Sequence, residues 1–164
     1  MKRTAVLFLL IVITACSHPH IHTCALKGVR YNGINELPSL KTYWGKDVNT
    51  VSVDNGKYCL SLCSNGDSST VLFEMAHEQP SGEIIYEILD SINAGASNQK
   101  RGIYLYGCEL LNHIDYTIFA SIKRPEDSNG NFEIINAWCA DTINNIIVPI
   151  TNLNGVTCKD VLRY

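Results

Sequence analysis

The chain has 164 residues, of which 46% are hydrophobic and 18% charged, and a formal net charge of −3. This length suits one domain that buries a core without help from metals or oligomerisation. The slightly acidic balance argues against a nucleic-acid-binding protein and against a polybasic membrane-binding patch.

The first 16 residues have the pattern of a bacterial lipoprotein signal. Lys2 and Arg3 give a positive start, residues 5–13 form an uninterrupted apolar run, and Ile13-Thr14-Ala15 precede Cys16. The apolar run is shorter than the about 20 residues that a spanning helix needs. The tetrad ending at Cys16 resembles the lipobox, whose cysteine receives the lipid. An ordinary secretory signal cut near Ala15 is the alternative.

Either signal exports the chain, and the lipobox leads us to expect a periplasmic protein that is held on a membrane by its lipid. Cys16 is followed by Ser17 and not by aspartate, which by resemblance to Gram-negative lipoproteins implies sorting to the outer membrane. Removing residues 1–15 leaves 149 residues with 11 basic and 16 acidic side chains, a formal charge of −5. That charge is compatible with a basic protein partner, although many domains are mildly acidic for solubility alone.

Seven cysteines make an odd count for an exported protein. If lipid occupies Cys16, six remain for up to three disulfides in an oxidising compartment. These candidates are Cys24, Cys59, Cys63, Cys108, Cys139 and Cys158. On one strand Cys59 and Cys63 would lie about 13 Å apart, beyond the roughly 7 Å limit for bridged Cα atoms, so twelve of the fifteen complete pairings stay open. Cys158 is well placed to fasten the C-terminus.

We expect three segments: residues 1–15 as the signal, 16–47 as lipidated cysteine, tether and irregular lead-in, and 48–164 as a β domain. In the tether, His18, His20 and His22 alternate, which fits either a metal site or, by preference, a plain polar linker. In the lead-in, Tyr43-Trp44 either docks onto the domain or stays exposed for a partner.

From residue 48, short runs of β-branched and aromatic residues alternate with turn signals, which predicts an all-β, disulfide-stapled sandwich of immunoglobulin-like or related type. The clearest hairpin covers residues 48–63 and turns at Asp54-Asn55-Gly56. Its second strand should turn Tyr58, Leu60 and Leu62 toward the core and Cys59 and Cys63 the other way.

Further strands are expected at residues 70–76, 103–106, 114–123, 131–139 and 143–150. In residues 114–123 the apolar side chains alternate, which predicts one continuous, half-buried strand. Pro149 predicts an edge position for the last strand. Residues 83–92 carry apolar residues at helical spacing, with Ser81 as a cap and Gly95 beyond the end, and predict the one short helix.

The chain carries none of the common catalytic or nucleotide-binding motifs, so we expect no enzyme and no cofactor. His113 and Asp115 could join a serine or cysteine in a triad only by chance combination. A nucleophilic Cys63 is disfavoured because an exported cysteine is more often oxidised.

Three stretches follow the lipobox in order: Val53-Asp-Asn-Gly-Lys-Tyr-Cys59-Leu-Ser-Leu, Cys108-Glu-Leu-Leu-Asn-His and Asp115-Tyr-Thr-Ile-Phe-Ala-Ser-Ile. This arrangement resembles the type VI secretion immunity periplasmic lipoproteins of Gram-negative bacteria. The resemblance covers roughly residues 48–123. It implies a lipid-anchored, non-enzymatic protein that binds and neutralises a toxin delivered to the periplasm.

Exposed loops and aromatic residues are the expected contacts with such a partner. The candidates lie in residues 77–83, in residues 93–101 and in the lead-in: Tyr43, Trp44, His77, Glu78, Glu83, Lys100 and Arg101. Two other classes remain open: an envelope structural or assembly lipoprotein without a toxin partner, and a metal-binding or enzymatic lipoprotein that uses His18, His20 and His22.

Overall fold

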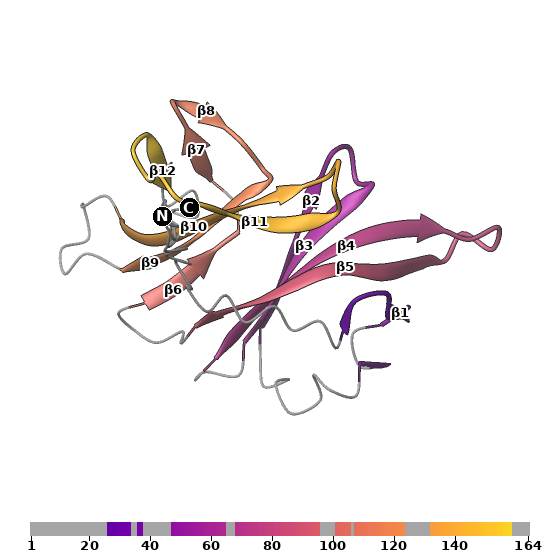
Figure 1. Cartoon of the computed structure of the whole chain (residues 1–164). Coiled ribbons are helices and arrows are strands. Elements are labelled where there is room, and N and C mark those ends of the chain that lie inside the picture. The colour runs from indigo at the N-terminus through magenta and orange to yellow at the C-terminus, as the bar shows by residue number, and fades with distance from the viewer. Residues whose placement is uncertain are drawn as a thin grey trace, which may run out of the picture.

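The computed structural model describes residues 26–33, 36–37, 47–64, 68–95, 101–105, 107–123 and 132–158. These residues form antiparallel β-strands and contain no α-helix, which confirms the predicted all-β class (Figure 1). The predicted signal and the lipobox lie outside them.

The strands form three sheets. The first sheet has the order β1-β5-β4-β3-β2. Its strands are β1 (Arg30–Tyr31), β2 (Asp47–Val53), β3 (Tyr58–Ser64), β4 (Ser69–Glu78) and β5 (Ile84–Gly95). The second sheet has the order β11-β10-β9-β6. Its strands are β6 (Arg101–Tyr104), β9 (Ile118–Lys123), β10 (Glu133–Asp141) and β11 (Ile146–Ile150). The small sheet, β12-β7-β8, contains β7 (Cys108–Leu110), β8 (His113–Ile114) and β12 (Val156–Cys158).

The main core lies between the first and second sheets. From the first sheet it receives Leu60 and Phe73, both fully buried, and from the second Phe119 and Trp138, whose rings stack at 5.4 Å. Tyr58, Leu60 and Leu62 face this core, as their alternation predicts. Two sheets packed face to face in this way confirm a sandwich.

The small sheet covers much of the other face of the second sheet. Ile118, Ala120 and Ile122 of β9 pack there with Cys108 and Cys158. Phe119 of the same strand faces the main core. β9 is therefore buried on both faces, where its alternation had predicted burial on one.

Part of the lead-in packs on the outer face of the first sheet. Leu26, Tyr31 and Leu37 join Cys63 and Ile88 in a separate apolar cluster. β1 also pairs with β5, with Tyr31 opposite Tyr86. Cys63 thus points away from the main core, as predicted, and packs against the lead-in.

The predicted hairpin at Asp54-Asn55-Gly56 is confirmed. β2 and β3 pair from Val53↔Tyr58 outward, and the three turn residues have φ values of 49°, 56° and 85°. Asn and Gly adopt these left-handed conformations readily, so the turn needs no help from the rest of the fold.

The predicted helix at residues 83–92 is wrong, because residues 84–92 belong to the twelve-residue strand β5. A β-bulge explains the misleading spacing: Phe73 pairs with Asp90 and Glu74 with Ile88, so Leu89 is the extra residue. Ile88 packs under the lead-in, whereas Leu89 enters the main core. The apolar residues are therefore divided between two faces of a strand instead of sharing one face of a helix.

The single strand predicted for residues 114–123 is also wrong. A turn separates β8 from β9, and the Asp115 Oδ1 accepts hydrogen bonds from the Thr117 amide at 2.9 Å and the Thr117 hydroxyl at 2.6 Å. This side-chain bonding offers the backbone an alternative to a strand ladder. As a result Ile114 and Tyr116, predicted to face the core, are 58% and 56% exposed.

β11 lies at an edge of the second sheet, as Pro149 predicts. The outward amide of Ile147 donates to the Asp90 Oδ2 at 2.7 Å, and Asp90 comes from the bulge of β5. Pro149 has no amide hydrogen to offer. The outer edge of β11 is thereby kept from pairing with another strand.

Candidate functional site

Several predicted site residues fall outside the described part of the chain. They are Cys16, Cys24, Tyr43, Trp44, Lys100 and the three histidines His18, His20 and His22.

The two predicted contact loops do not form one surface. His77 and Glu78 end β4 and Glu83 precedes β5, whereas Arg101 begins β6, after the far end of β5. The twelve residues of β5 span roughly 35 Å, so these two groups lie at opposite ends of that strand. Figure 1 shows the β4–β5 hairpin projecting away from the second and small sheets.

The residues of the β4–β5 hairpin are engaged within the fold. The Glu87 Oε2 lies 2.7 Å from the Arg30 guanidinium and 3.1 Å from the His77 Nε2. The hydrogen bond from Arg30 is the main cause that lowers the pKa of Glu87. Glu83 accepts a hydrogen bond from the Asn32 side chain. These contacts fasten β1 to β5 and give the hairpin a structural role.

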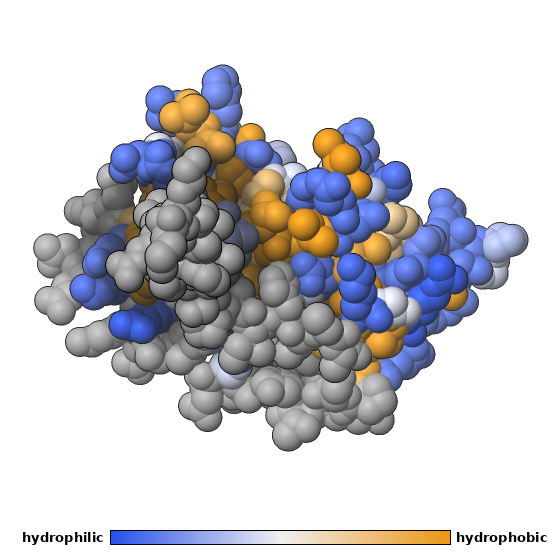
Figure 2. All heavy atoms as spheres, viewed as in Figure 1, coloured by the Kyte–Doolittle hydropathy of each residue, from blue (hydrophilic) through white to orange (hydrophobic). Residues whose placement is uncertain are grey.

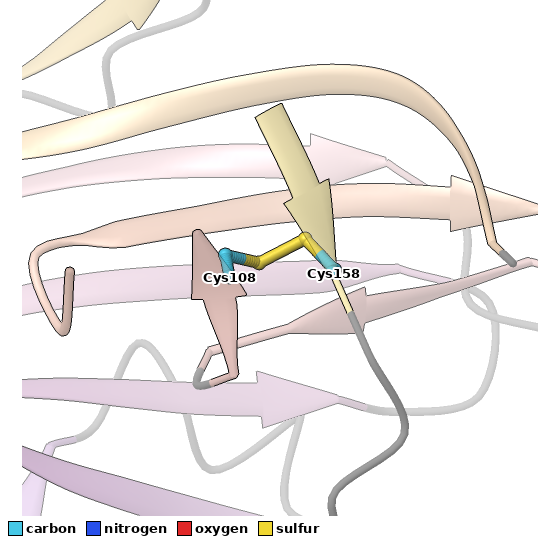
Figure 3. The surroundings of a disulfide bond; sticks show 2 residues. All are labelled: Cys108 and Cys158. Atoms are coloured by element: carbon cyan, nitrogen blue, oxygen red, sulfur yellow. A yellow bond between two sulfur atoms is a disulfide. The ribbon is translucent and has the colours of Figure 1, made fainter. Parts of the chain in front are cut away.

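The structure pairs two of the six cysteine candidates. Cys108 of β7 and Cys158 of β12 form a disulfide between directly opposed residues, which confirms that Cys158 fastens the C-terminal strand (Figure 3). Cys59, Cys63 and Cys139 are free thiols. The bridge between Cys59 and Cys63 that geometry disfavours is therefore not formed.

A tight turn joins β7 to β8. Leu110 pairs with His113, and the two residues between them, Leu111 and Asn112, have φ values of 53° and 67°. Two consecutive left-handed residues make a type I′ turn, in which Asn and Gly are common and a bulky residue such as leucine is unfavourable. Leu111 is nevertheless placed there, with its side chain 68% exposed.

The rest of the fold holds this turn in place. The Leu111 amide donates to the Gly155 carbonyl at 2.9 Å. A Cβ at Gly155 would lie 2.8 Å from the Leu111 side chain, and Gly155 itself has a φ of +85°. The hydrogen bond from Leu111 to Gly155 and the disulfide of β7 fasten this projection. We call it the hairpin tip; it comprises Leu111, Asn112, His113, Ile114 and Tyr116.

The hairpin tip is apolar where it is most exposed. Leu111, Ile114 and Tyr116 are all more than half exposed. Figure 2 shows hydrophobic atoms at the top of the β7–β8 hairpin, standing clear of the neighbouring surface. Strain and exposed apolar area thus occur in one place, which makes the hairpin tip the candidate functional site among the described residues.

A polar network lies on the opposite side of the molecule, under the lead-in. The carboxylate of Glu74, which is 1% exposed, accepts hydrogen bonds from the Ser61 hydroxyl at 2.6 Å and from the Tyr31 hydroxyl. Burial raises the pKa of Glu74, while the bonds from Ser61 and Tyr31 oppose that rise. The network ties the lead-in to the first sheet through Tyr31.

The residues considered for catalysis are not brought together. His113 is exposed on the hairpin tip, and Asp115 is bonded to Thr117. Burial, followed by the charge of Glu74, raises the pKa of Cys63 to about 12, which keeps it a thiol at neutral pH. Among the described residues there is no cluster of three or more His, Cys, Asp or Glu side chains that could hold a metal. That same part of the chain has no helix of the length and hydropathy needed to cross a membrane.

Sequence reasoning missed the hairpin tip. The turn residues Leu111-Asn112 lack the usual glycine, so the only available signal was the asparagine between two short apolar runs. In comparisons with known proteins, no family model, curated protein or solved structure matches the chain.

Proposed function

We propose that this protein is a lipid-anchored periplasmic inhibitor that binds and neutralises a toxin delivered by a type VI secretion system. The lipobox at Cys16 and the resemblance to immunity lipoproteins support this function. The observation that carries it is the hairpin tip, where Leu111, Ile114 and Tyr116 stand exposed on a disulfide-fastened β scaffold.

The hairpin tip has the properties of an interface anchor. Its backbone is fastened by the Leu111–Gly155 hydrogen bond and by the disulfide of β7, so binding does not have to order the turn and more of the contact energy remains for affinity. An inhibitor acts by occupying a surface, so it needs no reacting groups of its own.

The lipid would set the place of action. Only nine residues lie between Cys16 and Leu26, and the ten Cα–Cα steps that join the two residues reach about 35 Å when fully extended. The folded domain would therefore stay close to the membrane surface, where an incoming toxin enters the periplasm.

The neighbouring open reading frame tests this function directly. Its product is expressed in the periplasm alone, with the full wild-type chain, and with a Cys16→Ser chain. We expect toxicity alone, survival with the wild type, and weaker protection from the chain without its lipid. A neighbour that is harmless alone, or equally toxic beside the wild-type chain, would contradict the proposal.

Leu111→Asn separates binding from folding at the hairpin tip. Asparagine accepts a left-handed conformation, so relief of strain is expected to raise the free energy of unfolding by up to about 1 kcal/mol. Protection against the toxin should fall, because the most exposed apolar contact of the tip is gone. Urea unfolding and the survival assay measure the two effects. A variant that is destabilised yet fully protective would show that Leu111 serves the fold alone.

A further inference from the structure

The small sheet leaves part of the second sheet uncovered. Cys139 pairs with Ile118 on one side and with Val148 on the other, so their side chains share one face of the sheet. Ile118 is buried under the small sheet, whereas Cys139 and Val148 are half-buried. Ile146, two residues before Val148 on the same face, is also half-buried. Along β11, therefore, the small sheet does not cover this apolar face of the second sheet.

Exposed apolar residues stand at both ends of this strip. Tyr116 adjoins Thr117, whose hydroxyl lies 3.3 Å from the Cys139 Sγ. Ile143, in the β10–β11 turn, is 89% exposed. We call the whole surface the saddle; its residues are Tyr116, Cys139, Ile143, Ile146 and Val148. Figure 2 shows a hollow between the β7–β8 hairpin and the turns of β2–β3 and β10–β11, with hydrophobic atoms exposed over β11.

A partner would meet side chains at the saddle and would not add a strand to it. The outward amide of Ile147 already donates a hydrogen bond to the Asp90 side chain, and Pro149 has no amide hydrogen. Strand addition depends on main-chain hydrogen bonds along an open edge. The edge of β11 therefore favours a side-chain interface.

The saddle has an acidic rim. Asp115 precedes Tyr116, and Asp141 shares the face of Cys139 on β10. Burial is the main cause that raises the pKa of the Cys139 thiol, and the charges of Asp115 and Asp141 raise it further. Hydrogen bonds from Asn144 lower the pKa of Asp141, so that carboxylate is ionised at neutral pH. Both negative charges thus act on the centre of the saddle.

We propose that the saddle receives a basic protein segment in which an apolar side chain is bordered by lysine or arginine. The apolar side chain would pack against Ile143 and Val148, and the cations would face Asp115 and Asp141. This inference rests on the proposed function and identifies the saddle as the surface that binds the toxin. Charge complementarity of this kind speeds encounter and selects the partner.

Binding of the full chain, purified in detergent, to the purified product of the neighbouring open reading frame tests the inference. Ile143→Asp should raise Kd at least tenfold, because it puts a charge at the apolar end of the saddle. The double variant Asp115→Asn and Asp141→Asn keeps an acceptor oxygen at each turn but removes the charges. It should weaken binding severalfold at low salt and flatten its salt dependence. The matched control is Ile84→Asp, whose side chain is 43% exposed at the start of β5 and should stay within twofold of wild type.

The half-buried Cys139 gives a second measurement on the wild type. At alkaline pH, which offsets the raised pKa of its thiol, iodoacetamide should modify Cys139 in the free folded chain and at least fivefold more slowly in the complex, with the buried Cys59 and Cys63 as internal references. If the wild type binds but Ile143→Asp has no effect and Cys139 is not protected, the saddle is not the binding surface, while the proposed function stands. If Ile143→Asp weakens binding but the double asparagine variant does not, the partner segment is not recognised by its positive charge. If the wild-type chain does not bind, the proposed function fails, and this inference fails with it.

Discussion

Replacing Cys108 and Cys158 together by serine is expected to lower the free energy of unfolding by about 4 kcal/mol. The disulfide joins residues 50 positions apart, and closing a loop of that length removes a large amount of entropy from the unfolded chain. β12 contributes three residues and pairs only with β7 among the described strands, so without the disulfide it is held by that pairing and by the packing of Val156 on the second sheet. Urea unfolding of the double variant and the wild type measures the difference.

Cys139→Ser is the matched control for this change. Its thiol forms no disulfide and is half-buried, so its replacement should cost less than about 1 kcal/mol. The double variant should also lose protection against the toxin at temperatures where it is still folded, because the base of the hairpin tip is no longer fastened. A loss below about 1 kcal/mol in the double variant would mean that the packing of β7 on the second sheet suffices.

The elements that the sequence predicts well are determined by their own residues. The turn at Asp54-Asn55-Gly56 has the left-handed conformations that its residue types favour, and the alternation in β3 gives the correct core face. Pro149 likewise excludes a central strand by its missing amide hydrogen. In each case the decisive interaction lies within a few residues of the signal.

The elements predicted wrongly depend on distant partners. Leu89 is placed in a bulge by its pairing with β4, which converts a helix-like apolar spacing into two faces of one strand. Alternation in residues 114–123 continues across a turn that Asp115 forms with Thr117. Periodicity records which residues are apolar, but it cannot record where an extra residue or a turn changes the face.

The candidate site was still harder to predict. The pairing of Cys108 with Cys158 depends on β7 and β12 lying side by side, and six cysteines allow many pairings. Leu111 has the wrong residue type for its conformation, so turn signals could not identify it. The sequence instead favours charged loop residues as contacts, and the structure places His77 and Glu83 in contacts with Glu87 and Asn32. A strained apolar residue becomes visible as a candidate only once its backbone angle and exposure are known.

Glu74→Gln should make the protein more stable than the wild type at pH 8 and leave it nearly unchanged at pH 4. Burial raises the pKa of Glu74 in the folded state above its ordinary value of 4.5. The folded protein therefore holds this proton more tightly than the unfolded chain does. That contribution to stability is complete below pH 4.5 and is lost as the pH rises through the folded-state pKa. Glutamine stays neutral and can still accept from Tyr31 and donate to Ser61, so it avoids the loss.

Two further variants separate charge from hydrogen bonding at Glu74. Glu74→Ala leaves the Ser61 and Tyr31 hydroxyls without this acceptor and opens a cavity, so it should cost about 2–4 kcal/mol at pH 4. The cost should be smaller at pH 8, where the wild type has lost the stability that the Glu74 proton provides. Tyr31→Phe should remove one hydrogen bond and loosen the lead-in at a smaller cost. Urea unfolding at pH 4, 6 and 8 gives each value. The lowered pKa of Glu87 removes stability at acid pH in all variants alike, so the difference from wild type isolates Glu74. Parallel pH curves for the wild type and Glu74→Gln would show that Glu74 has the same proton affinity in the folded and unfolded chain.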